Sequence, residues 1–351
     1  MHKNNILALS KFLIMLVFLF FITTFLPHPN VLTIKTCSNV TKIKAATIHC
    51  KNRPDIATWK QFQDAGVTHI VLVPKATMYK FDRTGKLNDV ASSSYWSESV
   101  RGINEAVITS KKYGMQVIVK LHLYPSESVN MKGGLEKIKY TTELGKEYSP
   151  IVLRYAKLCN ELNVPIFVMC NETTEFYSNT DYWTKLIAEV RKAYHGKLTI
   201  GATATCVDQV NFWDKLDYIG VSGYYVVANR KNPTELEMKA GWIWHKRDLM
   251  DISAKYNKPI LFTEFGCNAS ESCAMRPWEW QKNLKGSSLN YPLQASYYST
   301  MLNAFWNEPW FAGICVWQTY SLSEIGNQGS TLGTPQGHEA WNVIKQYRVP
   351  D

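Results

Sequence analysis

Several features that identify common classes of protein are missing from this sequence. No glycine-rich turn follows the first predicted strand, so nothing supports an open sheet that binds a dinucleotide. Cysteine and histidine do not occur at the spacings of zinc sites, and no helix interleaves basic and aromatic residues as nucleic-acid-binding segments do. Repeats are also missing. We therefore expect no metal ion, no cofactor and no nucleic acid.

Acidic residues are missing from the first 44 positions, which hold five lysines. This segment accounts for half of the formal net charge of +10, so the basic excess says little about the rest of the chain. The composition is 46% hydrophobic and 13% aromatic, enough to bury a large core. We expect the 351 residues to form one large domain behind a basic N-terminal segment, and to be a monomer.

An uncharged apolar run covers residues 12–26 and follows Lys3 and Lys11, which is the pattern of a secretory signal. Its length lies between that of a signal peptide and that of a membrane-spanning helix, and no convincing cleavage site follows it. The domain is then either secreted or anchored in a membrane as a type II protein, outside the cytoplasm in both cases. The predicted parts are a signal peptide or signal anchor (1–27), a stem (28–44) and the folded domain (45–351).

Disulfides are permitted in that compartment, and the sequence has eight cysteines. Cys267 and Cys273 flank a short loop and are predicted to be bridged, although other pairings such as Cys37 with Cys50 stay open. Two cysteines inside apolar strands are expected to be free: Cys170 and Cys315. Asn39 and Asn268 begin sequons that look glycosylatable. Asn171 begins a third, which we expect to stay bare.

Short apolar runs alternate with amphipathic segments along the folded part of the chain. The predicted strands are residues 46–50, 67–74, 115–124, 164–170, 198–204, 218–224, 260–264 and 311–318. The predicted helices are residues 55–65, 94–113, 148–162, 182–194, 235–256, 293–306 and 338–347, with a short one near Phe212. Alternation of this kind calls for a parallel sheet with right-handed crossovers, and eight repeats close into a (β/α)8 TIM barrel.

Two of the predicted strands end in a carboxylate, Glu172 on the fourth and Glu264 on the seventh. The carboxyl ends of barrel strands meet in one mouth, where polar residues are typically catalytic. An acid that pairs with a nearby lysine or arginine is the simpler alternative for each one alone. The strand ends and adjoining loops are rich in aromatic residues, among them Trp96, Tyr225, Trp278 and Trp317, and such residues stack on sugar rings. Two carboxylates across such a cleft suit glycoside hydrolysis.

Specific segments of the chain resemble glycoside hydrolase family 113, mainly in the second half. The resemblance rests on residues 258–266 (KPILFTEFG), 276–280 (RPWEW), Gln294-Ala295, Trp317, Asn171-Glu172, Trp183, 186–191 (LIAEVR), 212–214 (FWD) and 217–220 (DYIG). It extends from about residue 55 to about residue 345. Members of this family are retaining β-mannanases with a (β/α)8 barrel.

The resemblance implies roles for individual residues. Glu172 corresponds to the acid/base and Glu264 to the nucleophile, while Tyr224 would hydrogen-bond the nucleophile. The residues implied in sugar binding are Asn171, His122, Tyr224, Trp278 and Trp317. An oligosaccharide or polysaccharide would then be the substrate, and the folded domain a hydrolase.

The chain also departs from the family pattern. Thr203 stands where an asparagine is usual, Leu144 replaces a tryptophan, and the loop over residues 125–143 differs throughout. These positions shape the sugar site, so the retaining chemistry is implied more strongly than mannan as substrate. The alternative is a carbohydrate-binding pseudo-enzyme on the same scaffold. Two intact carboxylates with their expected neighbours weigh against it.

Overall fold

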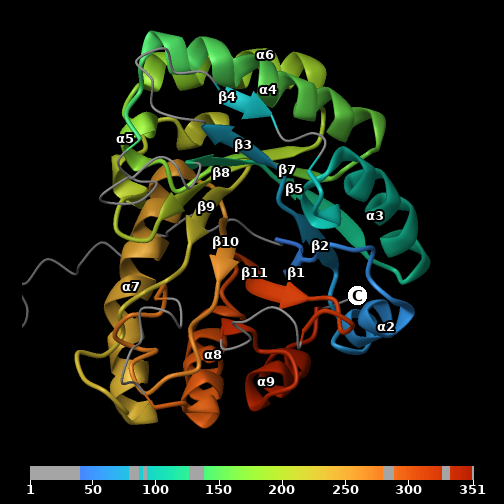
Figure 1. Ribbon diagram of the computed structural model, residues 1–351. Helices are drawn as coiled ribbons and strands as arrows, with labels where there is room; N and C mark the ends of the chain where they lie inside the picture. The colour runs from blue at the N-terminus through green and yellow to red at the C-terminus, as the bar shows by residue number, and fades with distance from the viewer. Residues whose placement is uncertain are drawn as a thin grey trace, which may run out of the picture. The chain divides into compact units, whose positions relative to one another are not determined.

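Eight parallel strands form a closed barrel in the computed structural model, which describes residues 40–78, 87–89, 93–125, 138–279, 288–325 and 333–349. Around the barrel they follow the order β1-β11-β10-β9-β8-β7-β5-β2 (Figure 1). Their bounds are β1 (Ile43–His49), β2 (His69–Leu72), β5 (Gln116–Lys120), β7 (Ile166–Asn171), β8 (Lys197–Thr203), β9 (Ile219–Ser222), β10 (Ile260–Phe265) and β11 (Phe311–Tyr320). The pairing of β1 with both β11 and β2 closes the sheet. The predicted TIM barrel is confirmed.

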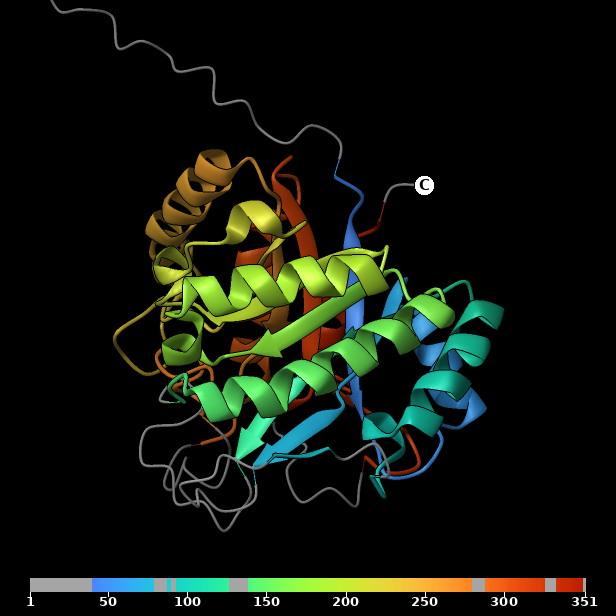
Figure 2. The same ribbon diagram turned by 90° about the horizontal axis from the view of Figure 1, so that it is seen from above.

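Helices alternate with the strands along the chain and surround the barrel (Figure 2). The described α-helices are α2 (Ile56–Asp64), α3 (Val100–Lys112), α4 (Thr142–Glu161), α5 (Thr174–Tyr177), α6 (Thr180–Ala193), α7 (Glu235–Tyr256), α8 (Tyr291–Phe305) and α9 (Glu339–Gln346). The 3-10 helices in the described ranges are η1 (Trp96–Glu98), η3 (Val207–Gln209) and η4 (Trp213–Lys215). Helix α4 begins six residues before its predicted start, because the Thr141 side chain caps it by accepting from the Leu144 N–H.

Helix α7 has the bounds that the sequence predicted, because a local start signal and a local stop signal mark its two ends. Thr234 and Glu237 form a capping box, in which each side chain accepts a hydrogen bond from the backbone N–H of the other. Asn257 ends the helix in the left-handed conformation with φ of 51°. Boundaries of this kind depend on a few adjacent residues, so the sequence alone locates them.

A second, smaller sheet stands at the carboxyl end of the barrel and was not predicted. The run over residues 115–124 is two strands, because the chain leaves the barrel after β5 and continues as β6 (His122–Pro125). Strand β3 (Lys75–Met78) likewise follows β2 and pairs in parallel with β6. Strand β4 (Leu87–Asp89) pairs with β3 on its other side, antiparallel. This sheet extends the wall of the mouth beside β2 and β5.

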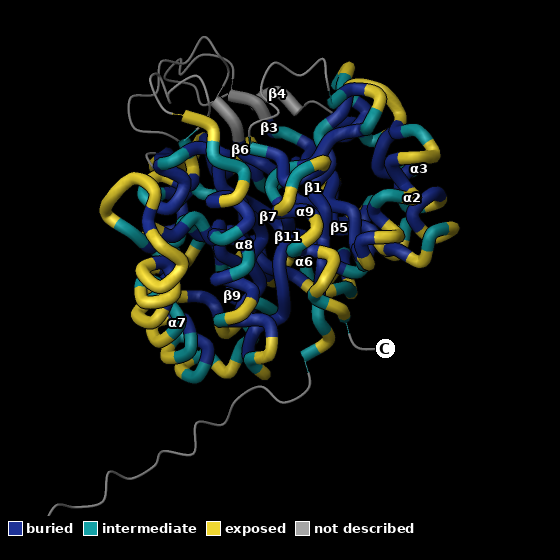
Figure 3. Tube along the Cα trace, turned by 90° about the horizontal axis from the view of Figure 1, so that it is seen from below, coloured by how far each residue is buried: buried dark blue, intermediate teal, exposed yellow. Residues whose placement is uncertain are grey.

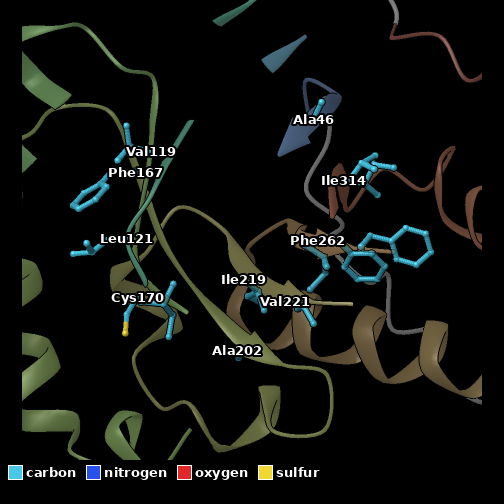
Figure 4. Close-up of a cluster of buried hydrophobic side chains, with 14 of the residues drawn as sticks. Ala46, Val119, Leu121, Phe167, Cys170, Ala202, Ile219, Val221, Phe262 and Ile314 are labelled. Atoms are coloured by element: carbon cyan, nitrogen blue, oxygen red, sulfur yellow. The ribbon is translucent and has the colours of Figure 1, made fainter. Parts of the chain in front are cut away.

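Apolar side chains fill two layers separated by the barrel wall. The smaller cluster comes from residues that point into the barrel, among them Val71, Ile118 and Leu261. The larger cluster lies between the strands and the surrounding helices (Figure 4). Successive side chains of a strand therefore point alternately into the barrel and toward the helices, because a strand has a side-chain period of two residues. Buried backbone occupies the centre of the molecule, while exposed residues gather on the helices and loops (Figure 3).

Two aromatic residues that the sequence placed near the mouth belong to this outer layer instead. Trp96 is 1% exposed and packs edge-on against Trp59, with ring centroids 6.5 Å apart. Tyr225 is buried against Trp242 and Phe262. Tyr225 follows the end of β9 and Trp96 begins η1, but their side chains pack against helices α7 and α2. Position after a strand does not decide which way a side chain points.

The rim loop after β10 corrects two predictions. Cys267 and Cys273 are free thiols, not a disulfide. Burial, and then the neighbouring Cys273, raise the pKa of Cys267 well above its usual range, so the protonated thiol lacks the reactive thiolate form. Asn268, predicted to be glycosylatable, is 3% exposed and donates to the Arg276 carbonyl at 2.9 Å. Its side chain also accepts from Ser270, so polar contacts hold the loop in place of the bridge.

All seven cysteines in the described part of the chain are free, including Cys170 and Cys315 as predicted. Cys37 and the sequon at Asn39 lie outside the described residues, as does the apolar run over residues 12–26. Within the described ranges, no helix is long and apolar enough to cross a membrane.

Candidate active site

Strand β7 ends at Asn171 and delivers Glu172 in an unusual backbone conformation. Glu172 has φ of 55°, in the left-handed region that side chains other than glycine and asparagine rarely adopt. Its N–H donates to the Gly201 carbonyl on β8 at 2.7 Å, which fixes this turn at the barrel mouth. Strain of this kind costs on the order of 1 kcal/mol and concentrates at functional sites. Glu172 is partly exposed.

The Glu264 carboxylate is 3% exposed near the end of β10, and side chains from three other strands or their ends surround it. Its Oε1 accepts from Lys120 Nζ at 2.7 Å and from Asn171 Nδ2 at 3.0 Å. Its Oε2 accepts from the Tyr224 hydroxyl at 2.8 Å. Asn171 in turn accepts from Ser222 at 3.4 Å. The predicted pairing of Tyr224 with Glu264 is present in the structure.

Charge keeps Glu264 ionised despite its burial. Burial raises the pKa of this carboxyl, but the Lys120 ammonium, and after it His122, lower that pKa to about 2. Burial lowers the pKa of His122 to about 4, so the imidazole is neutral near pH 7 and Lys120 supplies the positive charge. The pKa of Tyr224 is raised by burial and then by the charges of Glu264 and Glu172. Both carboxylates therefore act on one hydroxyl at the mouth.

Lys120 is the site residue that the sequence analysis missed. It is fully buried on β5, and its ammonium lies 4.3 Å from the centre of the Trp317 ring. The available signal was a charged residue inside the apolar run MQVIVKLHLY, two positions before His122 and so on the same face of the strand. Buried lysines are rare unless paired. Its partner Glu264 lies 144 residues further along the chain.

Aromatic rings form one side of the site. Trp317 on β11 stacks on His122 with ring centroids 5.6 Å apart and an interplanar angle of 11°. His122 Nε2 lies 3.4 Å from Glu264 Oε1, but it has no hydrogen-bond partner among the described atoms. This nitrogen is buried against the carboxylate in the structure. Trp278 is 50% exposed on the loop after β10, where its ring is open to solvent.

Two of the positions that depart from the family pattern have ordinary structural places, while residues 126–137 of the differing loop lie outside the described residues. Thr203 Oγ1 lies 3.0 Å from Thr174 Oγ1, just beyond the Glu172 turn. Leu144 is buried in the first turn of α4. At Thr174 a hollow of about 760 Å³ opens between the beginnings of α4 and α6. It is lined by Lys139, Tyr140, Thr174, Glu175, Ser178, Asn179, Thr180, Asp181 and Gln209. No cluster of potential metal ligands occurs in the residues described.

Comparisons with known proteins identify a family and similar folds. Residues 51–324 match the model of Glycoside Hydrolase Family 113. A solved complex of a GH113 β-1,4-mannanase superposes with a TM-score of 0.72 at 22% identity, over 88% of this chain and 98% of that one. The GH113 β-mannanase AaManA from Alicyclobacillus acidocaldarius gives 0.70 at 20% identity, over 89% and 98%. A fungal β-1,4-galactanase structure gives 0.55 at 12% identity, over 87% and 99%.

No curated protein matches the sequence. The family match covers most of the chain, including β2 to β11 and both glutamates at the mouth. The chain therefore belongs to glycoside hydrolase family 113 and is a glycoside hydrolase.

Proposed function

We propose that the protein hydrolyses β-linked manno-glycans with retention of configuration, with Glu264 as nucleophile and Glu172 as acid/base. The observation that carries this proposal is the environment of Glu264. An ionised carboxylate with three hydrogen-bond donors at a barrel mouth is suited to attack a sugar carbon. Mannan as the substrate rests on the names of the similar structures, which are described as β-1,4-mannanases and β-mannanases.

The proposed reaction has two steps. Glu264 attacks the anomeric carbon as the glycosidic C–O bond breaks, and the departing oxygen takes the proton of Glu172. This forms a glycosyl ester and leaves Glu172 ionised. Water then attacks the same carbon and gives a proton to Glu172, while the ester bond breaks and its electron pair returns to Glu264. Between Glu172 and Glu264, Trp317 would bind the sugar by stacking and His122 by hydrogen bonding.

Retention requires a short distance between the carboxyl groups, about 5 to 5.5 Å. We expect this separation between Glu172 and Glu264 and, in consequence, a β-anomer as the first product. NMR spectroscopy of a fresh digest tests it directly. An α-anomer as the first product would mean inversion and would remove the nucleophile role of Glu264.

The roles of the two glutamates are tested by substitution. Glu264→Gln should abolish turnover of β-manno-oligosaccharides and of activated aryl glycosides, because no ester can form. Glu172→Gln should lose the oligosaccharides but keep the first step on aryl glycosides, whose leaving groups need no proton. Glu161→Gln, an exposed glutamate at the end of α4, is the matched control and should behave as wild type. Equal losses for both site variants on the aryl substrate would contradict the assignment.

A panel of β-linked manno- and gluco-oligosaccharides decides the sugar. A pseudo-enzyme would bind members of this panel and turn over none of them, which is the competing function. The hollow lined by Thr174 and Gln209 adjoins the Glu172 turn and offers room for further sugar units.

We further propose that the hydrolase enters the secretory pathway through residues 1–27. The apolar run over residues 12–26 behind two lysines supports this. Sequencing the N-terminus of the mature protein, together with membrane fractionation, distinguishes a cleaved signal from a retained anchor. A full-length chain in the cytosolic fraction would refute both.

A further inference from the structure

The two oxygens of the Glu264 carboxylate have different partners. Oε1 accepts from Lys120 and Asn171, and His122 Nε2 lies 3.4 Å from it. Oε2 accepts from the Tyr224 hydroxyl. The crowded oxygen has little space for a sugar carbon, so Oε2 is the atom that can attack. Oε1 then becomes the carbonyl oxygen of any ester formed on Glu264.

Lys120 reaches Glu264 from the opposite side of the barrel. Three strands separate β5 from β10 in both directions around the sheet, so the side chain spans the barrel interior. Its Nζ donates to the Glu264 carboxylate at 2.7 Å and to the Thr263 carbonyl at 3.1 Å. It thereby holds both the side chain and the backbone of the strand end. Among the described side chains, Glu264 is the one carboxylate within ion-pair distance of Lys120.

We propose that Lys120 is a positioning residue that acts mainly in the second chemical step, by stabilising Glu264 as the leaving group when the glycosyl ester breaks down. The inference rests on the proposed function, because it requires an ester on Glu264. The role assigned to the Lys120 ammonium differs from that of the Tyr224 hydroxyl, which donates to the attacking oxygen Oε2.

The reason lies in how the charge on Glu264 changes during the cycle. The carboxylate is negative in the free enzyme and loses that charge when Oε2 bonds to the anomeric carbon. The attraction of Lys120 is therefore greatest before the first step, and it opposes attack slightly. In the second step water bonds to the anomeric carbon, the C–Oε2 bond breaks and the electron pair returns to the carboxylate. Lys120 already lies against Oε1 and stabilises the returning charge without rearrangement.

The surroundings of Lys120 strengthen this effect. The ammonium is fully buried, so water does not screen its charge. One of its faces lies over the Trp317 ring and one hydrogen bond goes to a neutral carbonyl. When Glu264 is esterified, the full positive charge stays buried beside a neutral ester. Breakdown of the ester restores the ion pair, which favours the second step over accumulation of the intermediate.

The test measures the two steps separately in the full-length enzyme. A 2-deoxy-2-fluoro glycosyl fluoride of the manno series forms a slow ester, and its rates of inactivation and of reactivation report the first and second steps. Lys120→Met should slow reactivation by about 10- to 100-fold, the range for losing a hydrogen bond to a charged group. Inactivation, measured at a pH where Glu264 is ionised, should change by a smaller factor. On an activated aryl glycoside the variant should show a burst of one leaving group per enzyme.

Two further variants keep the test decisive. Lys120→Gln retains a hydrogen-bond donor without the charge and should also reactivate slowly; it carries the test if the Met variant does not fold. Lys75→Met removes another lysine from an ion pair at the same end of the barrel, with Glu98 at 2.6 Å, and should reactivate at the wild-type rate. Equal slowing of both steps, or unchanged reactivation in both Lys120 variants, would overturn the proposal. Failure to label Glu264 in the wild type would instead refute the proposed function.

Discussion

Gly201 gives the most direct test of how the barrel positions the candidate nucleophile. It lies on β8 beside Asn171 in the strand register, and a Cβ at this position would stand 2.1 Å from Asn171 Oδ1 and 2.8 Å from Thr263 Oγ1. Its backbone conformation is one that alanine also adopts, so the obstacle is steric. Gly201→Ala must therefore push the Asn171 amide away from β8.

The size of the effect follows from these distances. An ordinary contact begins at 3.4 Å, so the amide must move by roughly 1.3 Å. A shift of that size breaks the 3.0 Å hydrogen bond from Asn171 Nδ2 to Glu264. Misplacement of a reacting group by about 1 Å costs on the order of 100-fold in rate. We expect kcat/KM on a β-manno-oligosaccharide to fall by about 100-fold, with a small loss of thermal stability.

A double-mutant cycle decides whether Asn171 transmits this effect. In an Asn171→Ala background the added Cβ has no amide to displace, so Gly201→Ala should cost little more. The assay is kcat/KM for the four proteins, with melting temperature as a check on folding. Additive losses in the cycle would show that Gly201→Ala acts through Thr263 or through the strand itself. Full activity of the single variant would refute the role of Asn171 in holding Glu264.

Two further predictions concern stability. The pKa of Glu264 is about 2 in the folded protein against an ordinary 4.5, so the stability that its ionised form contributes is present above pH 4.5 and is lost as the pH falls through about 2. The difference in melting temperature between wild type and Glu264→Gln should therefore shrink as the pH falls from 4.5 to 2. A constant difference would contradict the lowered pKa. Ser99 caps α3 by accepting a hydrogen bond from the Gly102 N–H at 3.0 Å. Ser99→Ala should therefore lower the free energy of unfolding, measured by urea denaturation, by about 1 kcal/mol and leave kcat unchanged. A change below about 0.3 kcal/mol would show that the cap is dispensable.

The sequence predicted the elements that depend on neighbouring residues. The barrel follows from the alternation of apolar runs with amphipathic segments, and the glutamates follow from where those runs end. Helix α7 was predicted residue by residue because Thr234 and Asn257 fix its ends locally. The small sheet of β3, β4 and β6 was missed, because the bend between β5 and β6 leaves no mark in a continuous apolar run.

Properties that depend on distant segments could not be predicted in this way. The state of Cys267 is set by burial beneath the rim, and the accessibility of Asn268 by its contact with the Arg276 carbonyl. Neither is visible in the spacing of cysteines or in a three-residue sequon. Trp96 and Tyr225 were assigned to the mouth for the same reason, since their burial depends on the helices that pack over them.

Lys120 shows how a sequence can still indicate such a contact. An ammonium inside an apolar barrel strand is too costly to bury without an opposite charge. The candidates were the two glutamates at the strand ends, and β5 lies next to β7 but across the barrel from β10. Lys120 is the last residue of β5, and its side chain points inward and has the reach to cross. Glu172, in the turn beyond β7, lies further toward solvent, so the buried partner had to be Glu264. The charge of Lys120 therefore acts on Glu264 and lowers its pKa, which keeps this carboxylate ionised as a nucleophile must be.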